Sequence, residues 1–290
     1  MTPKLLDPRL PALLVLLCAS TMSGCASLIS NAASDLADNL SSAILNQDDP
    51  ETVRAGMPSY MLLMDSFVEG SPDDPAMLGA AANLYASYGA VFADDDTRAS
   101  RLTRKARDYA LRGICNEYAA SCDWRELSYD DFVATLDGLT KAHADAVYLY
   151  SFATLAYLRA HASDWNSLAE LPQAEALLRR YFEISGASAR SAAHTYMGII
   201  LTLRPPSLGG KPEEAKIHFE KAINMSGGKD LSAKVEFAKG YAKLLYEREL
   251  HDQLVEEVLE ASPYADQLTL MNVLAQEEAL ALRAAADEYF

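Results

Sequence analysis

The chain has 290 residues and a formal net charge of −16, from 25 basic and 41 acidic side chains. Proteins bind nucleic acid mainly through Lys and Arg that neutralise phosphates, so this balance argues against a nucleic-acid partner. An acidic surface favours basic partners instead.

The N-terminal segment is typical of a secretion signal. Lys4 and Arg9 make its start basic, an apolar run follows, and the small residues of Cys18–Gly24 close it. The apolar run is shorter than the roughly 20 residues that a bilayer-spanning helix needs. Residues 1–24 are therefore predicted to be removed as a signal peptide. Their removal takes away Lys4, Arg9 and Asp7, so the mature chain has 23 basic and 40 acidic side chains and a net charge of −17.

Met22-Ser23-Gly24-Cys25 resembles the lipobox of bacterial lipoproteins, in which cleavage precedes a cysteine that carries diacylglycerol. That pattern usually has Leu where Met22 stands, and an ordinary signal followed by a chance cysteine is the alternative. We predict lipidation at Cys25, since two or three acyl chains anchor a protein stably where one is marginal. Ala26, with no Asp after the cysteine, resembles the outer-membrane sorting pattern. The expected location is periplasmic, with membrane contact through the lipid anchor only.

Residues 25–50 are rich in Ala, Ser, Asn and Asp and end in an acidic segment before a proline. This composition is typical of a spacer, so the stretch is predicted to be a lipidated N-terminal tether. Residues 51–290 are predicted to form the body, and about 240 residues are enough to enclose one hydrophobic core.

Two cysteines remain once Cys18 has left with the signal and Cys25 has taken lipid. Cys115 and Cys122 lie close in sequence, and an oxidising compartment permits them to form a disulfide. Two buried free thiols are the alternative. Two cysteines alone do not make a zinc site.

Helical periodicity recurs throughout the body, whereas strand alternation is nearly absent. The first example is a set of apolar residues three and four positions apart, the spacing of one helical face: Tyr60, Leu63, Met64 and Phe67. The predicted helices are Glu51–Glu69, Ala76–Phe92, Thr97–Ile114, Ala142–Ala160, Pro172–Ile184, Ser188–Leu203, Pro212–Met225, Leu231–Tyr246, His251–Leu259 and Asp266–Ala286. Short polar turns between long helices predict antiparallel pairs.

One such pair contains a small-residue and aromatic pattern typical of a tetratricopeptide (TPR) repeat. Ala215, Phe219 and Ala222 match its second helix, and Gly198 occupies the small position of its first helix. The insertion Arg204–Gly210 departs from the standard repeat, so the copy is degenerate.

A second, looser copy has the same spacings. Gly89, Ala106 and Gly113 stand at the same offsets as the small residues of the first copy, while Ala110 replaces the aromatic and Tyr109 lies beside it. The predicted fold is all-α, an α-solenoid of degenerate TPR-like antiparallel helix pairs.

Over nearly all of the mature body the chain resembles the T component associated with tripartite ATP-independent periplasmic (TRAP) transporters. The resemblance rests on Arg204–Gly210, Pro212, Ala215, His218-Phe219 and Ala222-Ile223, with support at Ala55–Pro58, Leu62–Asp65, Leu84–Ala86, Tyr88-Gly89, Tyr148–Tyr150 and Asn272–Gln276. It implies a periplasmic adaptor that binds the solute-binding P component, assembles as a homotrimer and handles an apolar ligand in a central lumen.

Candidate contact residues come from two features. Tyr85, Tyr88 and Tyr148 lie on first helices of the predicted pairs, which tend to line the concave surface of helical repeats, although core packing is the alternative for each. Arg204, Pro205 and Pro206 lie in a long, proline-stiffened turn that suits a recognition loop or sets a helix angle.

Motifs of catalysis and cofactor binding are missing from the sequence. The five histidines are scattered, no zinc-binding helix motif or nucleophile elbow occurs, and no glycine-rich loop suits a cofactor phosphate. We therefore expect a protein that is not an enzyme and has no metal or cofactor. Two alternatives remain: an outer-membrane TPR scaffold for envelope assembly, and a ligand carrier or hydrolase with a buried pocket.

Overall fold

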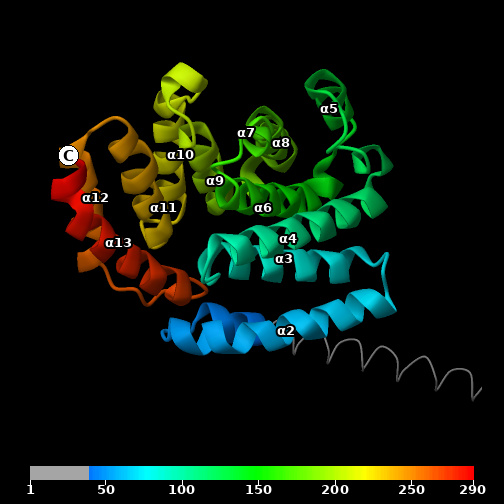
Figure 1. Ribbon diagram of the computed structural model, residues 1–290, viewed down its shortest axis with the longest axis horizontal. Coiled ribbons are helices and arrows are strands. Elements are labelled where there is room, and N and C mark those ends of the chain that lie inside the picture. Colours follow the sequence, from blue (N-terminus) through cyan, green and yellow to red (C-terminus); the bar gives the residue numbers. More distant parts are fainter. Residues whose placement is uncertain (1–38) are drawn as a thin grey trace, which may run out of the picture.

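The computed structural model describes residues 39–290 (Figure 1). The predicted signal peptide, Cys25 and the first part of the predicted tether lie outside the described residues. The end of that tether is helical over residues 39–45, and Asn46 then contacts the body. Its side chain donates to Asp266 Oδ1 at 3.4 Å and accepts from the backbone N–H of Gln267 at 2.7 Å.

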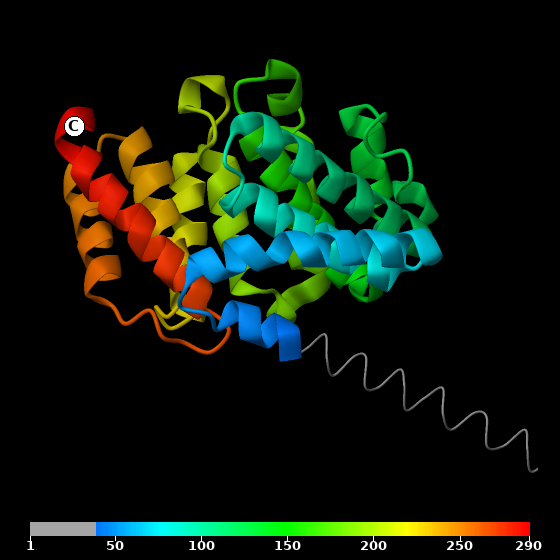
Figure 2. The ribbon, with the colours of Figure 1, turned by 60° about the horizontal axis from the view of Figure 1, so that its bottom comes forward.

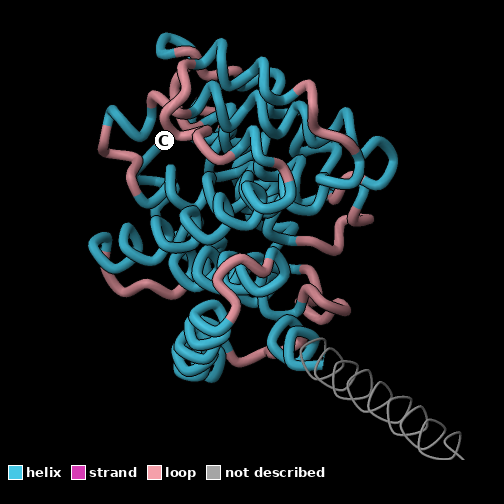
Figure 3. The backbone as a smooth tube through the Cα atoms, turned by 90° about the vertical axis from the view of Figure 1, so that its right-hand side faces the viewer, coloured by secondary structure: helices cyan, strands magenta, loops and turns pink. Residues whose placement is uncertain are grey.

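The described residues form helices and connecting loops without a strand (Figure 3). The α-helices are α2 (Pro50–Gly70), α3 (Pro75–Val91), α4 (Asp96–Glu117), α5 (Tyr129–Leu136), α6 (Ala144–Ala160), α7 (Trp165–Leu168), α8 (Leu171–Ser185), α9 (Ser191–Thr202), α10 (Pro212–Met225), α11 (Leu231–Glu236), α12 (Arg248–Glu260) and α13 (Thr269–Tyr289). A π-helical segment, η5 (Phe237–Ala242), continues α11. The all-α prediction is confirmed for this part of the chain, and none of its helices is long and apolar enough to cross a membrane.

Acidic side chains begin several helices. Asp95 caps α4 by accepting from the N–H of Arg98 at 2.8 Å. Asp74 caps α3 in the same way, and Pro75 follows at a position whose missing N–H costs nothing. These caps fix where each helix starts, and therefore which residues face the core.

The two helix pairs with the TPR-like pattern are in close contact. A Cβ built on Gly89 in α3 would lie 3.0 Å from side-chain atoms of α4, and one on Gly198 in α9 would lie 2.7 Å from the ring of Phe219 in α10. Ala106 in α4 and Ala215 in α10 are fully buried. Small residues thus let each pair approach, as the pattern predicts. The stacking of such pairs into a TPR-like solenoid stays a prediction, which these two contacts support.

Helix α2 turns a different face to the core from the one that apolar spacing first suggests. Val53, Met57, Met61 and Val68 are buried, whereas Leu63 and Phe67 are exposed. Figure 2 shows α2 lying across one side of the body. The apolar stripe of Tyr60, Leu63 and Phe67 therefore lies on the flank of the helix, with Met64 between the two faces. Tyr60 is 36% exposed, and Leu63 and Phe67 are each 47% exposed.

Several short elements between α4 and α8 were not predicted. Helix α5 and the single-turn helix α7 are too short to show a clear 3.6-residue period. Between α4 and α5, Cys115 and Cys122 are joined by a disulfide, with their Cα atoms 4.6 Å apart. The bridge links the last turn of α4 to the short 3₁₀-helix that follows it.

Candidate functional site

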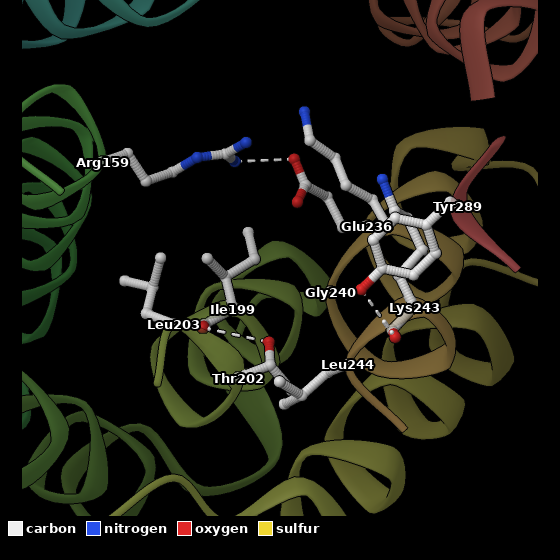
Figure 4. Close-up of a pocket in the computed structure, with 10 residues that line it drawn as sticks. Arg159, Ile199, Thr202, Leu203, Glu236, Gly240, Lys243, Leu244 and Tyr289 are labelled. Carbon is white, nitrogen blue, oxygen red and sulfur yellow. Dashed lines mark hydrogen bonds and ion pairs between the residues drawn. The ribbon is translucent and has the colours of Figure 1, made fainter. Parts of the chain in front are cut away.

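A cavity of about 330 Å³ lies between α6, α9, η5 and α13 (Figure 4). Its volume falls within the usual range for small-molecule sites. The lining combines apolar residues from α9 and the turn after η5 with charged residues from α6, the end of α11, η5 and the turn after it. It ends at the ring of Tyr289 in α13. Its residues are Arg159, Ile199, Thr202, Leu203, Glu236, Lys239, Gly240, Lys243, Leu244 and Tyr289.

Three of the charged residues in the lining are basic and one is acidic. Arg159 Nη1 donates to Glu236 Oε1 at 2.6 Å (Figure 4), and the negative charge of Glu236 raises the pKa of this guanidinium. Lys239 Nζ pairs with Glu278 at 2.7 Å on the neighbouring α13. Lys243 Nζ lies 4.2 Å from the ring centroid of Tyr289 and forms no ion pair within residues 39–290.

The π-helical turns explain how two lysines reach the same cavity. Lys239 and Lys243 are four residues apart at η5, where the wider winding of a π-helix changes the direction of side chains. Gly240 lies between them, and a Cβ there would be only 2.8 Å from Thr202 Oγ1 of α9. Glycine thus permits η5 to approach α9 closely while the lysines on either side face the opening.

Aromatic contacts fix the position of Tyr289. Its ring stacks on Tyr246 with centroids 5.5 Å apart, and its hydroxyl donates to the backbone oxygen of Lys243 at 3.0 Å. Tyr246 has φ of 57°, a left-handed conformation that is uncommon for a bulky residue and often occurs at functional sites. These two contacts hold the Tyr289 wall of the cavity in place.

Tyr85 lies in a separate polar cluster and not in the cavity. Its hydroxyl donates to Asp65 at 2.7 Å, and Asp65 also accepts from Tyr109 at 2.8 Å and from Lys105 at 2.6 Å. Burial by itself would raise the pKa of Asp65, but hydrogen bonds from Lys105 and the two tyrosines hold it below its usual value. Burial and the nearby carboxylate raise the pKa of Tyr85, so its phenol stays protonated and connects α3 to α2.

The other two predicted tyrosines also pack between helices. Tyr88 is buried, and its hydroxyl donates to the backbone oxygen of Arg54 at 3.3 Å. Tyr148 is half-buried and donates to the hydroxyl of Tyr196 at 3.2 Å, while the Arg190 guanidinium lies 4.5 Å from its ring. None of the three predicted tyrosines lines the cavity, and the structure does not bring them together.

The turn Arg204–Gly210 projects beyond the helix ends between α9 and α10. Its shape is fixed internally, since the N–H of Gly210 donates to Pro205 O at 3.1 Å and a Cβ on Gly210 would overlap the backbone of Arg204. Pro205 and Pro206 are exposed. Leu208 is 48% exposed. Figures 1 and 2 show α7 beside this turn, where Trp165 is 70% exposed.

A histidine pair is the remaining titratable cluster. His194 and His218 face each other with Nδ1 atoms 2.8 Å apart, and His194 stacks on Phe182. Burial lowers the pKa of His194 to about 4, so the ring is neutral at neutral pH. Within the described residues neither ring donates a hydrogen bond to a carboxylate, and no group of three potential metal ligands occurs there. The pair suits helix packing better than catalysis.

Sequence reasoning missed every residue of the cavity. The available signal was weak: Lys239 and Lys243 share a helical face in a strongly acidic chain. Arg159 and Tyr289 are distant in sequence, and no local pattern shows that they meet. The predicted site residues divide between helix packing, for the tyrosines, and an exposed turn, for Arg204, Pro205 and Pro206.

Comparison with known proteins agrees with the resemblance seen in the sequence. No curated protein matches the chain. The family model described as TRAP transporter T-component matches residues 46–290, which includes all of α2 to α13. The match begins at Asn46, whose side chain contacts Asp266 and Gln267 of the body. The chain therefore belongs to the TRAP transporter T-component family.

Proposed function

We propose that this protein is a periplasmic, lipid-anchored adaptor that binds the solute-binding P component of a TRAP transporter. The single observation that carries the proposal is the family match over residues 46–290. The anchor is the lipidated Cys25 in the outer membrane, and residues up to the body act as its spacer. Recognition relies on surface shape and apolar contacts, because the described residues present exposed aromatic and aliphatic side chains on fixed loops.

The edge formed by Trp165 and the turn Arg204–Gly210, here called the loop edge, is the proposed docking surface. Exposed tryptophans are among the residues that contribute most to protein–protein affinity when a partner buries them. Arg204, Pro205 and Pro206 belong to this edge, and the fixed turn lowers the entropy cost of binding. The loop edge lies beyond the ends of the long helices (Figure 2). A partner can therefore contact it without moving those helices.

Calorimetric titration of the full chain with the purified P component of the same organism tests the proposal. We expect a dissociation constant in the micromolar range or tighter, and a loss of about tenfold for Trp165→Ala or Leu208→Ser because each removes buried apolar contact. Leu280→Ser is the matched control, since Leu280 on α13 is 49% exposed and lies on another element. Absence of binding by the unaltered protein at micromolar concentrations would contradict the adaptor function.

A homotrimer is part of the proposal, and the stripe of Tyr60, Leu63 and Phe67 is the proposed contact between copies. Burial of such a stripe stabilises association, so light scattering should give the mass of a trimer. Phe67→Glu should shift the mass towards that of a monomer, whereas Leu280→Glu, at a similarly exposed apolar position, should not. A monomeric mass for the unaltered protein at high concentration would refute the trimer.

The cavity between α6, α9, η5 and α13 supports a second element of function, the handling of an organic ligand. Its volume and its apolar wall of Ile199, Leu203 and Leu244 suit an open site that contacts a small molecule on one side. We propose that this cavity is where the adaptor accepts such a ligand.

A further inference from the structure

We propose that the cavity binds a small organic anion, a carboxylate attached to an apolar body. The inference rests on the proposal that the cavity takes a ligand, and it names the ligand's chemical class. It is carried by the placement of Arg159, Lys239 and Lys243 around an apolar wall in a chain that is otherwise strongly acidic.

The charges of the cavity leave one positive charge uncompensated. Glu236 neutralises Arg159, and Glu278 neutralises Lys239. Lys243 forms no ion pair within the described residues. Its ammonium group instead makes a cation–π contact with the ring of Tyr289. Cation–π contact with an aromatic ring leaves an ammonium group able to accept a stronger partner. A carboxylate at the opening would supply that partner.

Arg159 offers a second contact to the same anion. Of its guanidinium nitrogens, only Nη1 donates to an acceptor in the part of the chain that the structure describes. A guanidinium has donors directed in a fork, so it can hold Glu236 and a ligand carboxylate together. An ammonium ligand would instead meet three cations and only one carboxylate of the lining, which disfavours it.

The uncharged part of the lining defines the rest of the ligand. Ile199, Leu203 and Leu244 form an apolar surface, and the Tyr289 ring stands beside Lys243 (Figure 4). Burial of an alkyl or aromatic group there contributes affinity in proportion to its area. A highly hydrophilic anion would lose that contribution, so a linear or aromatic monocarboxylate fits better than inorganic phosphate.

Calorimetric titration of the full chain in mild detergent with sodium octanoate tests the inference. We expect saturable binding with a dissociation constant of about 1 mM or tighter, and weaker binding at high salt. Octylammonium and 1-octanol have the same alkyl body without the negative charge, and both should bind at least about tenfold more weakly.

Lys243→Gln should raise the dissociation constant for octanoate by about tenfold, because it removes a charge-assisted contact and retains most of the side chain's length. Lys141→Gln is the matched control. It makes the same change of net charge at an exposed position before α6, about 25 Å along that helix from Arg159. Equal binding of octanoate and 1-octanol, or equal affinity in the Lys243→Gln and Lys141→Gln variants, would overturn the inference.

Titration with the P component separates this inference from adaptor function. Lys243→Gln leaves the loop edge unaltered, so its affinity for the P component should equal that of the unaltered protein. P-component binding without octanoate binding would refute the anion site alone. Octanoate binding without P-component binding would support the site and refute the adaptor.

Discussion

Replacing Glu170 with Ala should lower the free energy of unfolding by about 3 kcal/mol, the lower part of the range for removal of one partner from a buried ion pair. Arg107 in α4 is buried, with a side chain 4% exposed, and its guanidinium donates through Nη1 and Nη2 to the Glu170 carboxylate. Glu170 precedes α8 and is 29% exposed, so water can partly solvate Arg107 once the carboxylate is gone. Because water can reach Arg107 in part, the expected loss of unfolding free energy is at the lower end of that range.

Arg107 cannot relieve its isolation by losing its proton. Burial acts to lower the pKa of Arg107, but the neighbouring Tyr150 and Glu170 outweigh it and raise the pKa above its ordinary value. The Tyr157 ring, 4.7 Å from the guanidinium carbon, offers only a weak substitute for the carboxylate. The variant is therefore expected to hold a charged side chain between α4 and α8 without its counter-ion.

Urea unfolding followed by far-UV circular dichroism measures the difference through the transition midpoint at constant slope. Glu183→Ala is the control, because Glu183 is 63% exposed where it pairs with Arg180 three residues earlier, so water can replace it. Its loss should cost at most about 0.5 kcal/mol. If the Glu170→Ala and Glu183→Ala variants unfold at the same urea concentration, the Arg107 pair contributes no more than a surface pair.

The helices of the body follow from local sequence, because periodicity and capping are local properties. The acidic turn before α4 places Asp95 as its cap, and Pro212 stands at the first position of α10. The small residues Gly89 and Gly198 identify which helices approach closely, since a backbone contact requires a missing side chain. These features predict an all-α fold and two of its helix pairs.

Spacing does not determine which face of an apolar helix is covered. In α2, Met57 and Met61 are buried while Leu63 and Phe67 are exposed, although all four lie in one apolar-rich segment. Tyr85 illustrates the same limit: its position on a first helix suits either the concave surface or core packing, and in the structure its hydroxyl donates to Asp65. The packing of α3 and α4 against α2 decides both outcomes, and it depends on residues far apart in sequence.

The cavity shows the same limit for residues that are far apart in sequence. Arg159, Lys243 and Tyr289 meet only because α6, η5 and α13 pack around α9. A local pattern can show that Lys239 and Lys243 share one side of a helix. It cannot show that the side faces a cavity, because that depends on the π-helical turns and on Gly240 approaching Thr202.

Replacing Gly198 with Val should lower the free energy of unfolding by about 3 kcal/mol, at the upper end of the usual cost of overpacking. A Cβ at this position would lie 2.7 Å from the Phe219 ring, well inside van der Waals contact. The ring cannot retreat easily, because Phe219 is fully buried and stacks on Phe237 with centroids 5.2 Å apart. The α9–α10 pair must then separate or distort.

Gly56→Val in α2 is the matched control, since a Cβ there has no heavy atom within 4 Å. Valine has a better helix propensity than glycine by a few tenths of a kcal/mol, so this variant should be neutral or slightly stabilised in the same urea experiment. Phe219→Leu in the Gly198→Val background should restore part of the lost stability, because a smaller side chain relieves the overlap. Equal stability of the Gly198→Val and Gly56→Val variants would mean that Gly198 does not set the distance between α9 and α10.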